Sequence, residues 1–315
     1  MCLSKIKYLA EGLDVSLEVT VASLKLKHPV MNASGILGNT PGGVIRLIKL
    51  GFSAVVTKTI TPEPREGFKP PTIVKLPTGG LINAVGLANP GKGAIKELVA
   101  TAKEFQVPII VSIAGKSELE FTDVAAEAQR AGADAVELNL SCPHTEGYGI
   151  ELGSDPRKVR EVVEAVASTT SIPVLAKLGV TDKVVESAGK ALEAGADALV
   201  LINTVKAMYI DVYALRPVLT AKYGGLSGPP IHPIAVRVIY DVYKEYGAEI
   251  IGVGGVFDWK TAAEFIVAGA KAVQVGTALA SNEKVVEEIV SGLKEWVKVH
   301  NVRNINELVG AAHRA

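Results

Sequence analysis

The sequence predicts a barrel of eight parallel strands, each followed by a helix. This is the (β/α)8 TIM-barrel fold, here with extended loops over the carboxyl ends of the strands. Short β-branched runs alternate with longer segments of helical period, which is typical of βα units. About eight such runs can be counted, the number that closes a barrel. No Pro- or Ser-rich linker divides the 315 residues, so we expect a single domain over residues 1–315.

The predicted strands share an apolar, β-branched character. Three connections between them are unusually long, residues 59–91, 141–153 and 203–233. Because each follows a strand, we expect all three at the catalytic face. The strands themselves are predicted at residues 29–31, 54–58, 108–113, 133–139, 173–177, 196–202, 249–253 and 272–275.

The helices between the strands carry recognisable start and stop signals. Ser117 with Glu120 resembles a capping box, Pro156 stands at a first helical position after Asp155, and Asp258 precedes another helix. Glycine after a last turn permits a left-handed cap. Three helices run into such a turn, at Gly132, Gly195 and Gly269.

The composition indicates a globular protein that acts on small molecules. Hydrophobic residues make up 48% of the chain and charged residues 21%, so a large core can form. The charges of the 33 basic and 33 acidic side chains cancel, so the net charge does not attract the chain to nucleic acid or to an anionic membrane. Residues 1–15 lack a signal-peptide pattern, and no run of about 18 apolar residues occurs. We therefore expect a soluble, cytoplasmic protein.

The two cysteines, Cys2 and Cys142, limit the redox chemistry that this chain can hold. They are too few for a disulfide framework or for the ligand set of an iron–sulfur cluster. No Gly-x-Gly-x-x-Gly segment follows a strand to bind NAD or FAD. We expect no metal site here, and any iron–sulfur cluster should belong to another chain.

Polar or glycine residues end, or directly follow, seven of the eight predicted strands. A single strand-terminal Asn or Gly is often only a turn residue. In a barrel, however, the carboxyl ends of the strands converge on one mouth, so that residues distant in sequence face one bound molecule. The residues are Asn32, Lys58, Asn139, Lys177, Asn203 with Thr204, Gly254 with Gly255, and Gly276 with Thr277.

The loops after the seventh and eighth strands indicate a phosphate site. Gly254, Gly255 and Gly276 let the main chain approach phosphate oxygens, and Thr277 adds a hydroxyl donor. Barrels of unrelated chemistry share this feature, so it points to an anion and not to a reaction.

Two lysines, Lys58 and Lys177, lie in otherwise apolar strands. Burial of an ammonium is costly unless an anionic group meets it. A flavin offers such a partner, because the reduced ring carries negative charge around N1 and O2. A Schiff-base lysine is the alternative. We favour it less because the sequence shows no neighbouring carboxylate to act as its acid–base partner.

Cys142 lies just beyond the fourth strand, in the segment from Asn139 to His144 that reads Asn-Leu-Ser-Cys-Pro-His. A lone cysteine is most often a buried, inert thiol, but a loop at the catalytic face favours chemistry. A thiol with an unperturbed pKa of about 8.5 can be tuned to accept a carbon-bound proton, and its thiolate is also a good nucleophile. The residues alone leave a base and a covalent nucleophile both open.

Six segments in this order together resemble the dihydroorotate dehydrogenases over nearly the whole chain, and most closely their class 1B branch. Any one of them would be a weak signal, but the ordered set is specific. They are residues 32–35 and 57–58 with 63–67, which resemble two FMN loops; 83–91, the substrate loop; 139–143, the catalytic loop; 201–204, the sixth-strand motif; and 224–229, a loop before the seventh unit.

This resemblance implies an FMN enzyme that oxidises (S)-dihydroorotate to orotate in the pathway to UMP. Cys142 would remove the C5 proton while the C6 hydride passes to flavin N5. The positions that match FMN-binding residues are Ala33, Ser34, Gly35, Lys58, Asn139, Lys177, Ile202, Gly228, Gly254, Gly255, Gly276 and Thr277. Those that match substrate-binding residues are Lys58, Asn83, Val85, Gly86, Leu87, Asn139, His144, Asn203 and Thr204.

Two histidines depart from the family pattern. His144 stands where many class 1 enzymes have a substrate-binding Asn, and His232 where a Lys often follows the Gly-Leu-Ser-Gly-Pro segment. Imidazole can donate and accept like an amide, but it also gains charge near neutral pH. The Ser-Cys-Pro-His sequence is also similar to that of the dihydropyrimidine dehydrogenases, whose substrates lack the orotate carboxylate.

Two further functions stay open as alternatives to a dihydroorotate dehydrogenase. One is a barrel enzyme that uses Cys142 as a covalent nucleophile, and the other is a non-catalytic barrel that binds a phosphate ligand.

The resemblance also implies partners. Class 1B enzymes are known as assemblies in which a second subunit, carrying FAD and an iron–sulfur cluster, passes electrons to NAD. We expect such a separate electron-transfer subunit, on a homodimeric core of this chain. We do not expect a member of the membrane-bound, quinone-using class, because the residues before the first predicted strand do not resemble the N-terminal helical extension of that class.

Overall fold

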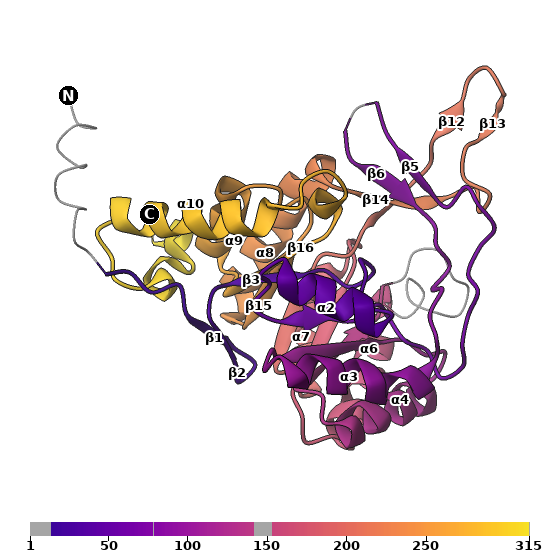
Figure 1. Cartoon of the computed structure of the whole chain (residues 1–315), viewed down its shortest axis with the longest axis horizontal. Helices are drawn as coiled ribbons and strands as arrows, with labels where there is room; N and C mark the ends of the chain where they lie inside the picture. The colour runs from indigo at the N-terminus through magenta and orange to yellow at the C-terminus, as the bar shows by residue number, and fades with distance from the viewer. Residues whose placement is uncertain (1–13, 78, 142–152, 315) are drawn as a thin grey trace.

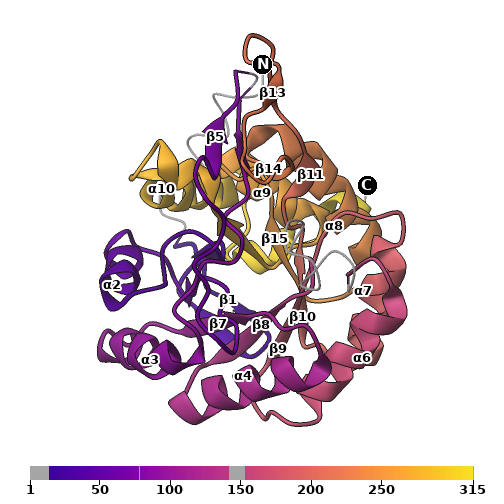
Figure 2. The same cartoon turned by 90° about the vertical axis from the view of Figure 1, so that its right-hand side faces the viewer.

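Eight parallel strands form a nearly closed barrel in the computed structural model, which describes residues 14–77, 79–141 and 153–314 (Figure 1 and Figure 2). All eight overlap the predicted strands, so the prediction of a (β/α)8 barrel is confirmed. In order around the barrel they are β3 (Val30–Asn32), β16 (Ala272–Val275), β15 (Ile250–Val253), β10 (Ala198–Leu201), β9 (Val174–Leu178), β8 (Ala135–Asn139), β7 (Ile109–Ile113) and β4 (Val55–Val56).

The side chain of Asn32 bridges the seam between β3 and β4, the two strands at the ends of this order. Its Nδ2 donates to the Val56 carbonyl at 2.7 Å, and its Oδ1 accepts from the Val56 N–H at 2.9 Å. The Ser53 N–H also donates to the Val30 carbonyl at 3.0 Å. Our expectation that Asn32 faces a ligand is therefore wrong. Its fully buried amide replaces the backbone pairing that a two-residue strand is too short to supply.

The helices pack around the outside of the barrel, as Figure 2 shows. Their apolar sides cover the strands, and every residue of β7, β8 and β9 is buried. Among the described residues the helices are α2 (Pro41–Lys49), α3 (Ile95–Glu104), α4 (Glu118–Ala131), α6 (Pro156–Ala167), α7 (Val184–Glu193), α8 (His232–Tyr246), α9 (Trp259–Ala268) and α10 (Val285–Val299). Shorter 3-10 segments are η1 (Lys92–Ala94), η2 (Pro229–Ile231), η3 (Thr277–Ala280), η4 (Ile305–Leu308) and η5 (Ala311–His313).

The predicted helix starts are where the sequence placed them, with one change in detail. Asp155 caps α6, and Asp258 forms a capping box with Thr261 at α9. The Ser117 hydroxyl accepts from the Glu120 N–H at α4, but the Glu120 carboxylate accepts from the Lys116 N–H. The predicted capping box at Ser117 is therefore only half formed.

Two of the three long connections build a second layer over the carboxyl ends of the strands. They form a four-stranded antiparallel sheet and a hairpin that project at the upper right of Figure 1. Residues 142–152 of the third connection lie outside the described residues. The sheet consists of β11 (Val205–Ala207), β14 (Gly224–Ser227), β6 (Leu81–Asn83) and β5 (Ile73–Lys75), and the hairpin of β12 (Ile210–Asp211) and β13 (Arg216–Pro217).

A second hairpin, β1 (Val19–Val21) and β2 (Leu24–Leu26), covers the opposite end of the barrel. The Ala22 N–H in its turn donates to the Glu249 carboxylate at 2.6 Å, and Glu249 directly precedes β15. Glu249 also pairs with Lys271. This end is therefore held by local ion pairs and is separate from the carboxyl-end layer. Within the described residues, no helix is both long and apolar enough to span a membrane.

His28 is buried just before β3, 7% exposed. Its Nε2 lies 3.0 Å from the Gly51 carbonyl, and its Nδ1 accepts from the Val30 N–H at 3.3 Å. Burial is the main reason that the pKa of this imidazole falls from 6.5 to about 4. The native state thus holds His28 neutral where an unfolded chain would protonate it, and protonation below pH 6.5 favours unfolding.

We predict that acid destabilises the protein partly through His28. Between pH 7.5 and pH 5, the stability advantage of the wild type over His28→Gln should shrink by about 2 kcal/mol. The folded-state pKa lies below the unfolded one, so this stability is present above pH 6.5 and is lost as pH falls toward 4. Urea unfolding of both proteins at each pH measures it. A difference between the proteins that does not change with pH would contradict the prediction.

Candidate active site

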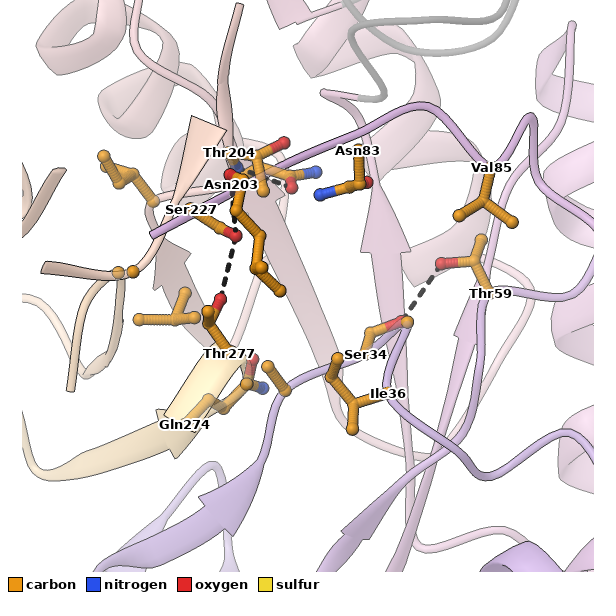
Figure 3. A pocket seen from close by; sticks show the side chains of 18 of the residues that line it. Ser34, Ile36, Thr59, Asn83, Val85, Asn203, Thr204, Ser227, Gln274 and Thr277 are labelled. Atoms are coloured by element: carbon orange, nitrogen blue, oxygen red, sulfur yellow. Dashed lines mark hydrogen bonds between the residues drawn. The ribbon is translucent and has the colours of Figure 1, made fainter. Parts of the chain in front are cut away.

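A cavity opens at the carboxyl ends of the barrel strands, beneath the second layer (Figure 3). It holds about 1260 Å³ of empty space including its open mouth.

Apart from Asn32, every predicted site residue that the structure describes lines this cavity. Cys142 and His144 lie outside the described residues, so the structure does not place them. The lining residues that the sequence predicted are Ala33, Ser34, Gly35, Lys58, Asn83, Val85, Gly86, Leu87, Asn139, Lys177, Ile202, Asn203, Thr204, Gly228, Gly254, Gly255, Gly276 and Thr277.

Sequence reasoning missed part of the lining. Most of the missed residues are apolar and carry no signal of their own, but Thr59 follows Lys58 directly, and Gln274 is a polar residue inside the apolar strand β16. The same rule that singled out the lysines could have found Gln274. The missed residues are Ile36, Thr59, Ile73, Leu81, Ser227, Ile231, Val253, Val256 and Gln274.

A chain of hydroxyl and amide groups crosses one side of the cavity. Thr59 Oγ1 lies 3.1 Å from Ser34 Oγ, across the barrel seam (Figure 3), and accepts from Asn139 Nδ2 at 3.1 Å. Asn203 Nδ2 in turn lies 3.2 Å from Asn139 Oδ1 and 3.0 Å from Ser141 Oγ. These bonds orient both amides. The neutral groups at this side suit a planar polar ligand.

Glycine loops and backbone donors form the other side of the cavity. Gly255 adopts φ +74°, and a Cβ there would lie 2.7 Å from the Gly228 carbonyl oxygen, so only glycine fits. Within the described part of the chain, the backbone N–H groups of Gly255, Gly276 and Thr277 have no acceptor. The Thr277 hydroxyl donates to Ser227 Oγ at 2.8 Å (Figure 3). Free N–H groups in glycine loops are the donors that a phosphate requires.

Lys58 brings an uncompensated charge into the cavity. Its ammonium has no hydrogen bond or ion pair with any described residue. Burial lowers the pKa of Lys58 below its usual value, because the charged form is poorly solvated there. An anionic ligand would supply the missing partner.

Lys177, in contrast, is paired beneath the cavity. Its Nζ lies 3.3 Å from Glu137 Oε1 and 3.4 Å from Gln274 Oε1. We disfavoured a Schiff-base lysine because no carboxylate neighbours it, and for Lys177 that premise is wrong. Glu137, on the adjacent strand β8, is such a carboxylate, and sequence distance concealed it.

His232 lies behind the glycine loops and does not line the cavity. Its Nδ1 lies 3.1 Å from the Gly254 carbonyl, and its Nε2 lies 2.7 Å from the Glu264 carboxylate. The imidazole thus supports the Gly254 loop from its outer side.

Comparisons with known proteins show the family to which the chain belongs. The family model described as dihydroorotate dehydrogenase matches residues 16–297. The chain belongs to the dihydroorotate dehydrogenase family. This is a family of flavoenzymes, oxidoreductases that act on CH–CH donors.

Curated relatives of the family are similar along almost their whole length. A protein of Aeropyrum pernix named putative dihydroorotate dehydrogenase A (fumarate) is 50% identical over 301 residues, covering 95% of this chain and 98% of that protein. The dihydroorotate dehydrogenase B (NAD(+)) catalytic subunit of Pyrococcus abyssi is 46% identical over 94% of this chain and 99% of its own. That of Thermoplasma volcanium is 46% identical over 95% and 98%. The relatives thus carry two different names for the electron acceptor.

We predict that Gly255→Ala raises the Kd for the flavin at least tenfold. The new Cβ would push the Gly228 carbonyl away and displace the free N–H groups of the loop. Fluorescence titration of the apoprotein with FMN measures the effect. Gly93→Ala is the matched control, because a Cβ at Gly93 meets no atom within 4 Å. Equal affinity of the wild type and Gly255→Ala would contradict a role for the Gly255 loop in binding the flavin.

Proposed function

We propose that this chain binds FMN in the cavity and oxidises (S)-dihydroorotate to orotate, on the route to UMP. The observation that carries the proposal is the charge of the cavity. Among its described lining residues are two lysines, Lys58 and Lys177, and no Asp or Glu. A phosphate, a reduced flavin and an orotate carboxylate are all anionic, and such a lining favours each of them.

The donor set on the glycine side fits FMN. Backbone N–H groups of Gly255, Gly276 and Thr277, with Gly228 and Gly254 beside them, would hold the phosphate. Ala33, Ser34, Gly35 and Ile202 would flank the ring, and Lys177 would face its N1/O2 edge, with Lys58 and Asn139 also in reach. Bound FMN supplies a hydride acceptor at N5.

The amide side fits the pyrimidine. Asn83, Asn139, Asn203 and Thr204 offer neutral donors and acceptors to the ring, and Lys58 offers a cation to its carboxylate. Val85, Gly86 and Leu87 would close over the substrate from the loop after β6, and His144 would add a further contact.

Cys142 would act as the base that takes the C5 proton. The chain reaches it from Ser141, which is buried and anchored at the cavity. Ser141 Oγ donates to the Lys177 carbonyl at 3.3 Å and lies 3.0 Å from Asn203 Nδ2. A thiolate at this position would accept the proton while Asn139 and Asn203 hold the ring.

We further propose a separate electron-transfer subunit with FAD and an iron–sulfur cluster, on a homodimeric core. The names of the Pyrococcus and Thermoplasma relatives, catalytic subunit with NAD(+), support a partner. The β12–β13 hairpin offers apolar surface for protein contacts, since Val212, Tyr213 and Leu215 are 72%, 96% and 84% exposed. Fumarate is the second candidate acceptor, because the Aeropyrum relative carries that name.

We predict that dihydroorotate bleaches the flavin absorbance of the purified, FMN-loaded protein under anaerobic conditions. Dihydrouracil should bleach it far less, because it lacks the carboxylate that Lys58 would meet. Cys142→Ala should bind FMN normally and lose at least about a hundredfold in the rate of flavin reduction, the usual contribution of a general base. Stopped-flow absorbance measures both.

Cys2→Ala is the matched control for the thiol and should reduce its flavin at the wild-type rate. A near-normal rate of flavin reduction in Cys142→Ala would contradict the proposal that Cys142 is the base. A colourless protein with no affinity for FMN would reject the proposed function altogether.

Turnover assays of the purified chain, with and without an added electron-transfer subunit, identify the electron acceptor. We expect dihydroorotate oxidation with NAD only after an electron-transfer subunit is added, because this chain has only two cysteines to offer a cluster. Turnover is followed as orotate formation with NAD and, separately, with fumarate. Rapid reduction of NAD by this chain without a partner would contradict the two-subunit proposal, and rapid turnover with fumarate would favour the second candidate.

A further inference from the structure

Three polar side chains form a buried layer directly beneath the cavity. Glu137 and Gln274 are fully buried and Lys177 is 4% exposed. Lys177 Nζ lies 3.3 Å from Glu137 Oε1 and 3.4 Å from Gln274 Oε1, and Gln274 Nε2 donates to Glu137 Oε2 at 2.8 Å. Each of the three therefore contacts both others. Lys177 and Gln274 line the cavity, whereas Glu137 does not.

The layer spans the full width of the barrel. In the strand order, β16 and β8 lie four positions apart in a ring of eight, so they face each other across its interior. Gln274 of β16 nevertheless reaches Glu137 of β8, and Lys177 joins them from β9. Side chains from opposite walls thus meet only because the barrel closes.

Stability alone does not account for a carboxylate at this depth. Replacing a buried ion pair by apolar residues of similar volume is often neutral or stabilising. Hydrocarbon side chains could fill the same layer, as they fill the rest of the core. The carboxylate instead stands behind the cation that would face the flavin, with no solvent to screen it.

We propose that Glu137 is a positioning residue that sets the reduction potential of the flavin through Lys177. The inference rests on the proposed flavin function. Lys177 attracts the negative charge that the flavin gains on reduction, and Glu137 offsets part of that attraction while it holds the ammonium in place. With the carboxylate neutralised, the reduced flavin is bound more tightly relative to the oxidised flavin, and the potential rises.

Two variants separate charge from geometry. Glu137→Gln keeps the size and hydrogen-bonding capacity of the side chain and removes its charge. The double variant Glu137→Gln with Gln274→Glu restores one carboxylate, one amide and one ammonium, and moves the charge to the other partner of Lys177. Glu249→Gln is the matched control, since Glu249 pairs with Lys271 at the opposite end of the barrel.

The experiment is an anaerobic titration of each FMN-loaded protein against reference dyes, read from the flavin absorbance, with the Kd for oxidised FMN measured by fluorescence. Glu137→Gln should shift the ratio of reduced-flavin to oxidised-flavin affinity at least tenfold, which is about 30 mV upward for a two-electron couple. The double variant should return to the wild-type potential or below it, and Glu249→Gln should match the wild type.

An unchanged potential in a yellow Glu137→Gln protein would overturn the inference. So would a raised potential that the double variant retains, because the effect would then be geometric. If Glu137→Gln does not fold, the double variant decides alone. Its carboxylate lines the cavity, so a potential above the wild-type value refutes the proposal. A wild-type protein that binds no FMN would instead refute the proposed function.

Discussion

The hydrogen bonds of Asn32 across the seam of the barrel are the constraint on which the cavity depends. β3 and β4 are the ends of the strand order, and two residues of β4 are too few to close it by backbone pairing alone. With the seam bridged, the loops after these strands meet, and Ser34 and Thr59 lie 3.1 Å apart. The same curvature of the sheet that lets the seam close places Gln274 of β16 within reach of Glu137 of β8 across the interior. The cavity wall and the buried layer thus both depend on the curved, closed form of the barrel.

The electrostatic design of the cavity has two levels. Its described lining carries cations and no carboxylate, so anions are favoured where ligands bind. One layer below, Glu137 compensates Lys177, whereas Lys58 has no described counter-ion. The two lysines are therefore unequal. Lys58 offers an incoming anion a cation with no described counter-ion, whereas the attraction that Lys177 exerts is partly offset by a fixed carboxylate.

Local patterns made the strands and the strand-end residues of the cavity predictable, and the family resemblance added further lining residues such as Asn83 and Gly228. Strand ends such as Lys58 and Gly276 are readable because a polar or glycine residue interrupts an apolar run, and the fold places all such ends at one mouth. Side-chain contacts between distant strands could not be predicted from the sequence. Asn32 looks like other strand-end residues yet closes the seam, and Glu137 is distant in sequence from Lys177. Both depend on which strands become neighbours or face each other, and that is a property of the closed barrel.

The ionisable side chains that line the cavity bear on which residue acts as the base in the proposed reaction. Of the described residues that line the cavity, only Lys58 and Lys177 titrate. Lys177 is engaged with Glu137 below the proposed flavin site. Burial lowers the pKa of Lys58, but a bound substrate carboxylate would favour its charged form, which cannot accept a proton. The amides and hydroxyls are too weakly basic to deprotonate carbon. For the proposed reaction we therefore place the base in the segment that follows Ser141, in agreement with our proposal for Cys142.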